Sequence, residues 1–233
     1  PLHNPEFTGL EWYAIHADYH RLMERTEAMC LSLWPEQKLG YQGQLIDLSP
    51  PWPRYTVHQA FLEYANLHLP AYITRDDLVQ ACQQHQLSVH DDDLWDDLFF
   101  KLFLTLVEPH LGRERPIFLT EYPIQMAALA RPKPQAPHVA ERVELYIAGL
   151  ELANGYSELT DPYEQRRRWE ADAAIKNQEY HRKYPIDPQF LAALEHLPPC
   201  TGIAVGIDRL LMLHCDAASI QEVLPFPMYP ARS

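Results

Sequence analysis

The chain has few of the patterns that usually mark a metalloprotein or a membrane protein. Its four cysteines, Cys30, Cys82, Cys200 and Cys215, have no C-x-x-C spacing, and its twelve histidines form no H-E-x-x-H pair. These absences argue against a transition-metal site, and scattered cysteines are typical of reduced thiols in the cytoplasm. Because there is no secretory signal and no apolar run of about 18 residues, we expect no membrane segment.

Positive charge is also scarce. The 233 residues contain 19 Lys and Arg against 32 Asp and Glu, which gives a formal net charge of −13. This balance argues against a broad basic surface for nucleic acid, although a local basic strip could still form. Apolar residues make up 47% of the chain, an ordinary value for a folded protein. We expect one domain over residues 1–233.

The common phosphate-binding loops are absent as well. There is no G-x-x-x-x-G-K-[ST], and GIAVGID lacks the G-x-G-x-x-G spacing. Any nucleotide must therefore be held in another way.

Helical patterns fill the first half of the chain and strand patterns follow them. Apolar spacing of three and four residues predicts a helix over 19–34, with Leu22, Met23, Met29, Cys30 and Leu33 on its buried side. Further helices are predicted within 56–68, 74–85 and 91–111. After Gly112, PIFLTEYP, RVELYIAGLELANGY and TGIAVGI are typical of strands, and helices return at 164–184 and 208–214. Clustered rather than alternating elements favour an α+β fold with an antiparallel sheet.

The segment ERVELYIAGLELANGYSELTD (141–161) predicts a hairpin that carries two acidic side chains. A tight turn at 148–149 would place Glu144 and Glu151 on one face, directly or diagonally opposite. Facing carboxylates repel unless a cation lies between them, and Mg²⁺ prefers oxygen ligands. A Mg²⁺ site and two solvated glutamates at a sheet edge both remain open at this point.

Strand alternation places Asn154, Tyr156 and Glu158 on the face opposite Glu151. The four side chains can line one pocket only if the strand bulges or bends. Gly155 is the residue that we expect at such a bulge.

Three segments, taken in order, resemble the signatures of class II aminoacyl-tRNA synthetases, and most of all the lysyl branch. HNPEFTGLEWY (3–13) is similar to the second half of motif 2. The hairpin segment is similar to the strand pair that builds the metal and amino-acid pocket. GIAVGIDRLLML (202–213) is similar to motif 3.

The resemblance implies a catalytic core in which helices flank an antiparallel sheet and an amino acid is activated with ATP and Mg²⁺. It also implies a homodimer. Motif 1, which usually forms the dimer, and the motif 2 arginine would lie upstream of Pro1.

On the nucleotide side, the resemblance implies that Phe7 stacks on adenine, that His3 and Asn4 lie near the phosphates, and that Arg209 clamps the triphosphate. Gly202 and Gly206 would let adenine or ribose approach the strand. Arg209 and Glu151 are the expected catalytic residues. The full expected ATP site comprises His3, Asn4, Phe7, Glu144, Glu151, Gly206 and Arg209, with Mg²⁺ on Glu144 and Glu151.

On the amino-acid side, the resemblance implies that Glu11 and Tyr13 recognise a lysine ammonium group. Asn154 and Glu158 would hold the α-carboxylate region and the cationic side chain, and Tyr156 would pack along the aliphatic stem. A buried ammonium needs a carboxylate partner, which Glu158 and Glu11 could supply.

Two branches share these motifs: lysyl-tRNA synthetases, and shorter paralogues that ligate a lysine isomer to elongation factor P. Ala204 and the ELANG arrangement around Ala153 resemble the paralogues, as do VEPHLGRERP and QMAALA, whereas FLTEYP and VLPFPMYP resemble the tRNA enzymes. Lysyl-tRNA synthetases typically have glycine where this chain has Ala204. The added methyl group would shift the selectivity between lysine isomers by ~1–3 kcal/mol. We expect lysine or β-lysine as substrate and elongation factor P as acceptor. The alternatives are charging of tRNA-Lys and a catalytically silent nucleotide-binding paralogue.

Overall fold

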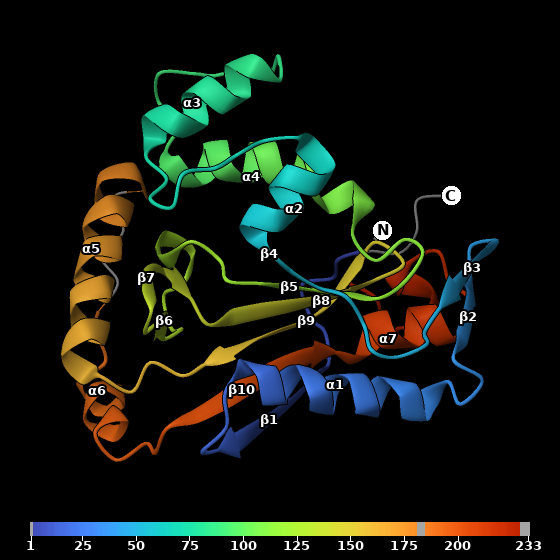
Figure 1. The fold of residues 1–233 in the computed structure, drawn as a ribbon. Coiled ribbons are helices and arrows are strands. Elements are labelled where there is room, and N and C mark those ends of the chain that lie inside the picture. The colour runs from blue at the N-terminus through green and yellow to red at the C-terminus, as the bar shows by residue number, and fades with distance from the viewer. Residues whose placement is uncertain (1, 181–184, 229–233) are drawn as a thin grey trace.

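The computed structural model describes residues 2–180 and 185–228, and its centre is a six-stranded sheet in the order β1-β10-β9-β8-β5-β4 (Figure 1). Neighbouring strands are antiparallel except for β4 and β5, which are parallel. The predicted α+β class is confirmed. The strands are β1 (Gly9–Ile15), β4 (Arg54–Thr56), β5 (Ile117–Thr120), β8 (Arg142–Ile147), β9 (Leu150–Ser157) and β10 (Cys200–Gly206).

Helices α1 (Tyr19–Leu33) and α7 (Ile207–His214) pack on one face of this sheet. Asp18 caps α1 by accepting hydrogen bonds from the first-turn amides. Leu22 and Cys30 are buried as expected, but Leu33 is 42% exposed at the last position of the helix. Gly155 belongs to this face, because an added Cβ would lie 2.8 Å from Leu22 Cδ2.

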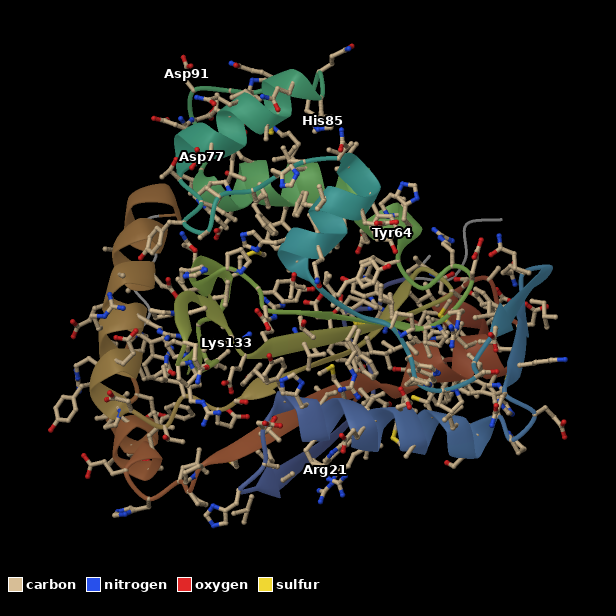
Figure 2. All side chains as sticks on the ribbon, viewed as in Figure 1. Arg21, Tyr64, Asp77, His85, Asp91 and Lys133 are labelled. Carbon is tan, nitrogen blue, oxygen red and sulfur yellow. The ribbon has the colours of Figure 1, made fainter. Side chains whose placement is uncertain are left out.

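A layer of helices covers the opposite face at the β5 and β8 end of the sheet (Figure 1). It contains α2 (Val57–Ala65), α3 (Arg75–Gln84) and α4 (Trp95–Leu106). Thr56 and Thr74 form capping boxes at α2 and α3. The acidic residues Asp77 and Asp91 lie at the outer end of this layer, far from the sheet (Figure 2).

The helix predicted over 91–111 is shorter in the structure. Asp93 accepts a hydrogen bond from the His90 amide, which closes a turn before the helix begins at Trp95. After Leu106 the chain tightens into a 3-10 turn, Glu108–His110, because Pro109 has no amide hydrogen for an α-helical bond.

The remaining elements flank the sheet. Helix α5 begins at Pro162, earlier than predicted, and its predicted last residues, 181–184, lie outside the described residues. The sequence did not predict the two small hairpins or helix α6. These elements are α5 (Pro162–Tyr180), α6 (Pro188–Leu194), β2 (Lys38–Tyr41), β3 (Gln44–Asp47), β6 (Pro132–Lys133), β7 (Ala136–Ala140) and the 3-10 turns Ile124–Met126 and Ile220–Glu222.

Two further features bear on the sequence-based expectations. None of the helices that the structure describes is long and apolar enough to cross a bilayer. The four cysteines are free thiols, of which only Cys215 is exposed.

Candidate functional site

The β8–β9 hairpin forms as predicted and positions the two glutamates. Ala148 and Gly149 form its turn, with φ values of 57° and 77°. Glu144 pairs with Asn154, and Tyr146 pairs with Glu151. Glu144 and Glu151 therefore lie diagonally opposite on one face of the sheet.

A bulge brings Asn154 to that same face, but it lies earlier than expected. The register shifts between Leu145, which pairs with Ala153, and Tyr146, which pairs with Glu151. Leu152 is therefore the extra residue, and the predicted bulge position at Gly155 is wrong. A buried leucine supplies the irregularity because both Leu152 and Ala153 contribute to the core beneath the hairpin.

The strand register aligns the predicted amino-acid residues in two rows across the sheet. Glu11, Ala204, Asn154 and Glu144 occupy one row over β1, β10, β9 and β8. The neighbouring row contains Tyr13, Gly202, Tyr156 and Arg142. Both rows use every second residue of β1 and β10, so their side chains project from the same face.

A cavity of about 390 Å³ lies over this face and beside the start of α7. Phe7 is 69% exposed there, so it is not a core aromatic residue. The predicted residues that line the cavity are His3, Asn4, Phe7, Glu11, Glu151, Asn154, Ala204, Gly206 and Arg209. A second cavity, of about 370 Å³, is lined by Tyr64 and by none of the predicted residues.

Arg209 joins the two sides of the main cavity. It lies in the first turn of α7, as predicted, directly after the end of β10. Its Nη1 donates to the backbone oxygen of Glu151 at 2.5 Å, and Nη2 lies 3.2 Å from Nδ1 of His3. A guanidinium group fixed in this way can present its remaining donors to an anion.

The two glutamates have different surroundings. The carboxylate of Glu144 is buried and accepts hydrogen bonds from Tyr122, Tyr146 and Arg142. The carboxylate of Glu151 accepts none from any described residue, and its nearest guanidinium nitrogen, Arg209 Nη1, is 4.0 Å away. Burial, followed by repulsion from Glu144, raises the pKa of Glu151 to about 7.

This oxygen-rich pair fits a hard divalent cation. A cation would favour the ionised form of Glu151 and offset its repulsion by Glu144. Glu151 is the glutamate with free acceptor capacity, because the Glu144 oxygens already share their lone pairs with three donors.

A further carboxylate, that of Glu158, lies outside the lining of the main cavity and has no hydrogen bond or ion pair with any described residue. Burial raises its pKa to about 7. Its Oε1 would lie 2.6 Å from a Cβ added at Gly202, and Tyr13 Cε1 would lie 2.7 Å from that atom. Gly202 therefore makes room for Tyr13 and Glu158, which corrects its predicted role beside a nucleotide.

Tyr156 completes this second cluster. Burial and then the charge of Glu158 raise the pKa of Tyr156 to about 12, so its hydroxyl stays protonated. A half-buried carboxylate near two phenols, with no cationic partner among the described residues, is suited to bind an ammonium group.

Sequence reasoning missed several residues at the site. Arg142, Tyr122 and Tyr146 enclose Glu144, and the buried Asp208 accepts a 2.6 Å hydrogen bond from the Thr8 amide. The alternation of β8 could have placed Arg142 and Tyr146 on the same face as Glu144, since each is two residues away from it along the strand. Nothing in the local sequence indicates Tyr122, which comes from the loop after β5.

Comparison with known proteins defines the class first. Residues 1–230 match the tRNA synthetases class II (D, K and N), and the chain belongs to this family. The expected class II catalytic fold is thereby confirmed. Family membership also supports the expectation of a ligase that uses ATP and Mg²⁺.

Among individual proteins, the chain is similar to lysine–tRNA ligases. It is 40% identical to that of Thermosynechococcus vestitus over 235 residues, which is 97% of this chain and 46% of that protein. It is 39% identical to that of Moorella thermoacetica over 231 residues, again 97% of this chain and 47% of that protein. The chain thus spans less than half the length of these relatives.

Proposed function

We propose that this chain activates lysine or a close isomer of it with ATP, to form an aminoacyl adenylate. The observation that carries the proposal is the half-buried carboxylate of Glu158, which lies near Tyr13 and Tyr156 and has no cationic partner among the described residues. Such a group favours a cationic side chain over a neutral one. The adjoining cavity offers the guanidinium group of Arg209 for the phosphates and the exposed ring of Phe7 for the base of a nucleoside triphosphate.

The residues divide into two groups in this reaction. Glu158, Tyr13, Tyr156 and Glu11 hold the amino acid by its ammonium group and its aliphatic stem. Asn154 and its neighbours across the sheet then orient the carboxylate of the amino acid toward the nucleotide. The site contributes to the rate by holding the two reactants in this orientation.

The attacking carboxylate oxygen forms a bond to the α-phosphorus of ATP, and the bond from that phosphorus to pyrophosphate breaks. Arg209 neutralises the charge that develops on the phosphates. Mg²⁺, held by Glu151 with Glu144 behind it, would supply further charge neutralisation when bound. His3, Asn4, Phe7 and Gly206 provide the contacts to the nucleotide.

The acceptor has two candidates. The names of the relatives favour transfer to tRNA-Lys. Transfer to a lysine amine of elongation factor P is favoured by Ala204, whose methyl group lines the cavity between Glu11 and Asn154, and by the net charge of −13. A homodimer and a cytoplasmic location remain predictions.

The decisive experiment is exchange of labelled pyrophosphate into ATP, with α-lysine and β-lysine as separate substrates. We expect exchange with at least one of them and none with alanine. No exchange with either lysine would indicate the catalytically silent alternative. Transfer assays with tRNA-Lys and with elongation factor P then identify the acceptor, since only one should be modified efficiently.

A further inference from the structure

Arg142 is a partly buried cation that contacts residues on both strands of the β8–β9 hairpin. Its side chain is 18% exposed and donates to both Glu144 and Asn154. Nη2 donates to Glu144 Oε1 at 2.5 Å, Nη1 donates to the Met126 backbone oxygen at 2.7 Å, and Nε donates to Asn154 Oδ1 at 3.3 Å. The guanidinium carbon lies 4.5 Å from the centre of the Tyr122 ring.

These contacts fix the orientation of the guanidinium group. Two of its nitrogens are held by a carboxylate and a backbone oxygen, and an aromatic ring covers it. The Nε–H donates to the side chain of Asn154 and to no other side chain or backbone oxygen of the described residues. Because arginine donates hydrogen bonds and accepts none, it can bind only the oxygen of the Asn154 amide.

The orientation of the Asn154 amide follows from this constraint. With Oδ1 turned toward Arg142, the Nδ2 amino group must point the other way. Nδ2 donates to none of the residues that the structure describes, and Asn154 lines the main cavity. The cavity is therefore presented with a hydrogen-bond donor at this position, and a donor is what a carboxylate needs.

We infer that Arg142 is a positioning residue that fixes the Asn154 amide so that Nδ2 binds the carboxylate of the amino acid. The inference rests on the proposed function and adds to it how the site selects an α-carboxylate. Arg142 touches no substrate in this role. It acts through Asn154. Its hydrogen bond to Glu144 also ties the position of Asn154 to the two glutamates, Glu144 and Glu151.

The test compares two ligands that differ only in the carboxylate. Lysine and 1,5-diaminopentane, which is lysine without its carboxylate, are titrated calorimetrically into the protein and into the Arg142→Lys variant. In the Arg142→Lys variant, the new side-chain amine keeps a positive charge beside Glu144. It lacks the forked guanidinium group that also reaches Asn154. We expect lysine binding to weaken about tenfold, the value of one hydrogen bond to a charged group, and diamine binding to change less than about twofold.

A matched control and a second variant complete the design. Arg131→Lys alters another half-buried arginine, paired with Glu141 at 2.5 Å and outside the cavity lining, and should weaken neither ligand. Asn154→Asp places an acceptor where Nδ2 was, so it should weaken lysine binding and leave diamine binding intact. This variant decides the question if Arg142→Lys does not fold.

The outcomes separate the inference from the proposed function. Equal losses for both ligands in Arg142→Lys, or unchanged lysine binding in Asn154→Asp, would overturn the positioning role while leaving lysine activation in place. If the unaltered protein binds no lysine, the proposed function is wrong and the inference is overturned with it.

Discussion

At the scale of single residues, the proposed role of Glu151 as a ligand of Mg²⁺ can be tested most directly. It has no hydrogen-bond partner among the described residues, and burial and the charge of Glu144 raise its pKa to about 7. Glu151→Gln keeps the side-chain volume but removes most of the attraction for Mg²⁺. We expect adenylate formation to fall by far more than about tenfold, or ~1.4 kcal/mol in barrier, with the fold retained.

Pyrophosphate exchange measures this loss, and circular dichroism checks the fold. Glu24→Gln is a suitable control, because Glu24 is half exposed and its one ion pair among the described residues is with Arg21 on the surface of α1. A loss of less than about tenfold in Glu151→Gln would show that Glu151 is not a metal ligand.

Ala204 is the residue on which the identity of the substrate isomer depends. Ala204 lines the cavity and pairs with Glu11 on one side and Asn154 on the other. Ala204→Gly should enlarge the cavity there and increase activation of α-lysine relative to β-lysine, within the ~10–200-fold that one carbon can supply. The measured quantity is the ratio of kcat/KM for the two isomers, since a general loosening of the strand would affect both. If the ratio is the same in both proteins, Ala204 does not select between the isomers and only packs in the strand.

At the scale of elements, the β8–β9 hairpin shows how a turn holds a functional side chain in place. Gly149 has a φ of 77°, and a Cβ there would lie 2.5 Å from the Arg113 guanidinium carbon. The Ala148 amide also donates to the Gly112 oxygen at 2.7 Å. The turn is thus clamped by the segment after α4, two residues before Glu151.

Gly149→Ala should therefore cost backbone strain and also displace the Arg113 guanidinium, whose Nε donates to the Pro109 oxygen at 2.9 Å. Gly43, in the turn between β2 and β3, has a similar φ of 76° and no atom within 4 Å of an added Cβ. Gly43→Ala measures the strain of a left-handed residue, of order 1 kcal/mol. We expect Gly149→Ala to lose further stability and to impair pyrophosphate exchange, which Gly43→Ala should leave intact. Equal unfolding free energies for the two variants would contradict a clamp at Arg113.

The same hairpin shows where sequence reasoning succeeds and where it stops. Turn residues and strand alternation are local, so the hairpin and the shared face of Glu144 and Glu151 could be predicted. The bulge at Leu152 could not, because it depends on packing beneath the sheet rather than on a glycine. Strand alternation could have placed Arg142 beside Glu144, but its contacts with Met126 and Tyr122 come from the loop after β5 and could not be predicted locally.

At the scale of the whole molecule, the raised pKa values of Glu151 and Glu158 make stability depend on pH. A carboxyl group whose pKa is higher in the fold than in the unfolded chain holds its proton more tightly when folded. Its contribution to stability is complete below the unfolded value near 4.5 and is lost as the pH rises through about 7, the folded value of both Glu151 and Glu158. These two groups should therefore make the protein less stable at pH 8 than at pH 5.

Thermal unfolding of the protein and of the Glu151→Gln, Glu158→Gln double variant at both pH values tests this expectation. Both side chains are partly exposed, so each group should contribute on the order of 1 kcal/mol, or about 2–4 °C in Tm. The double variant should lose less Tm between pH 5 and pH 8 than the unaltered protein, because its amides do not ionise. Lysine and Mg²⁺ at pH 8 should raise the Tm of the unaltered protein alone, since each neutralises one of the two charges. If the two proteins show the same change of Tm with pH, neither carboxylate is held in the fold at an energetic cost, and the case for Glu158 as an ammonium partner loses its physical basis.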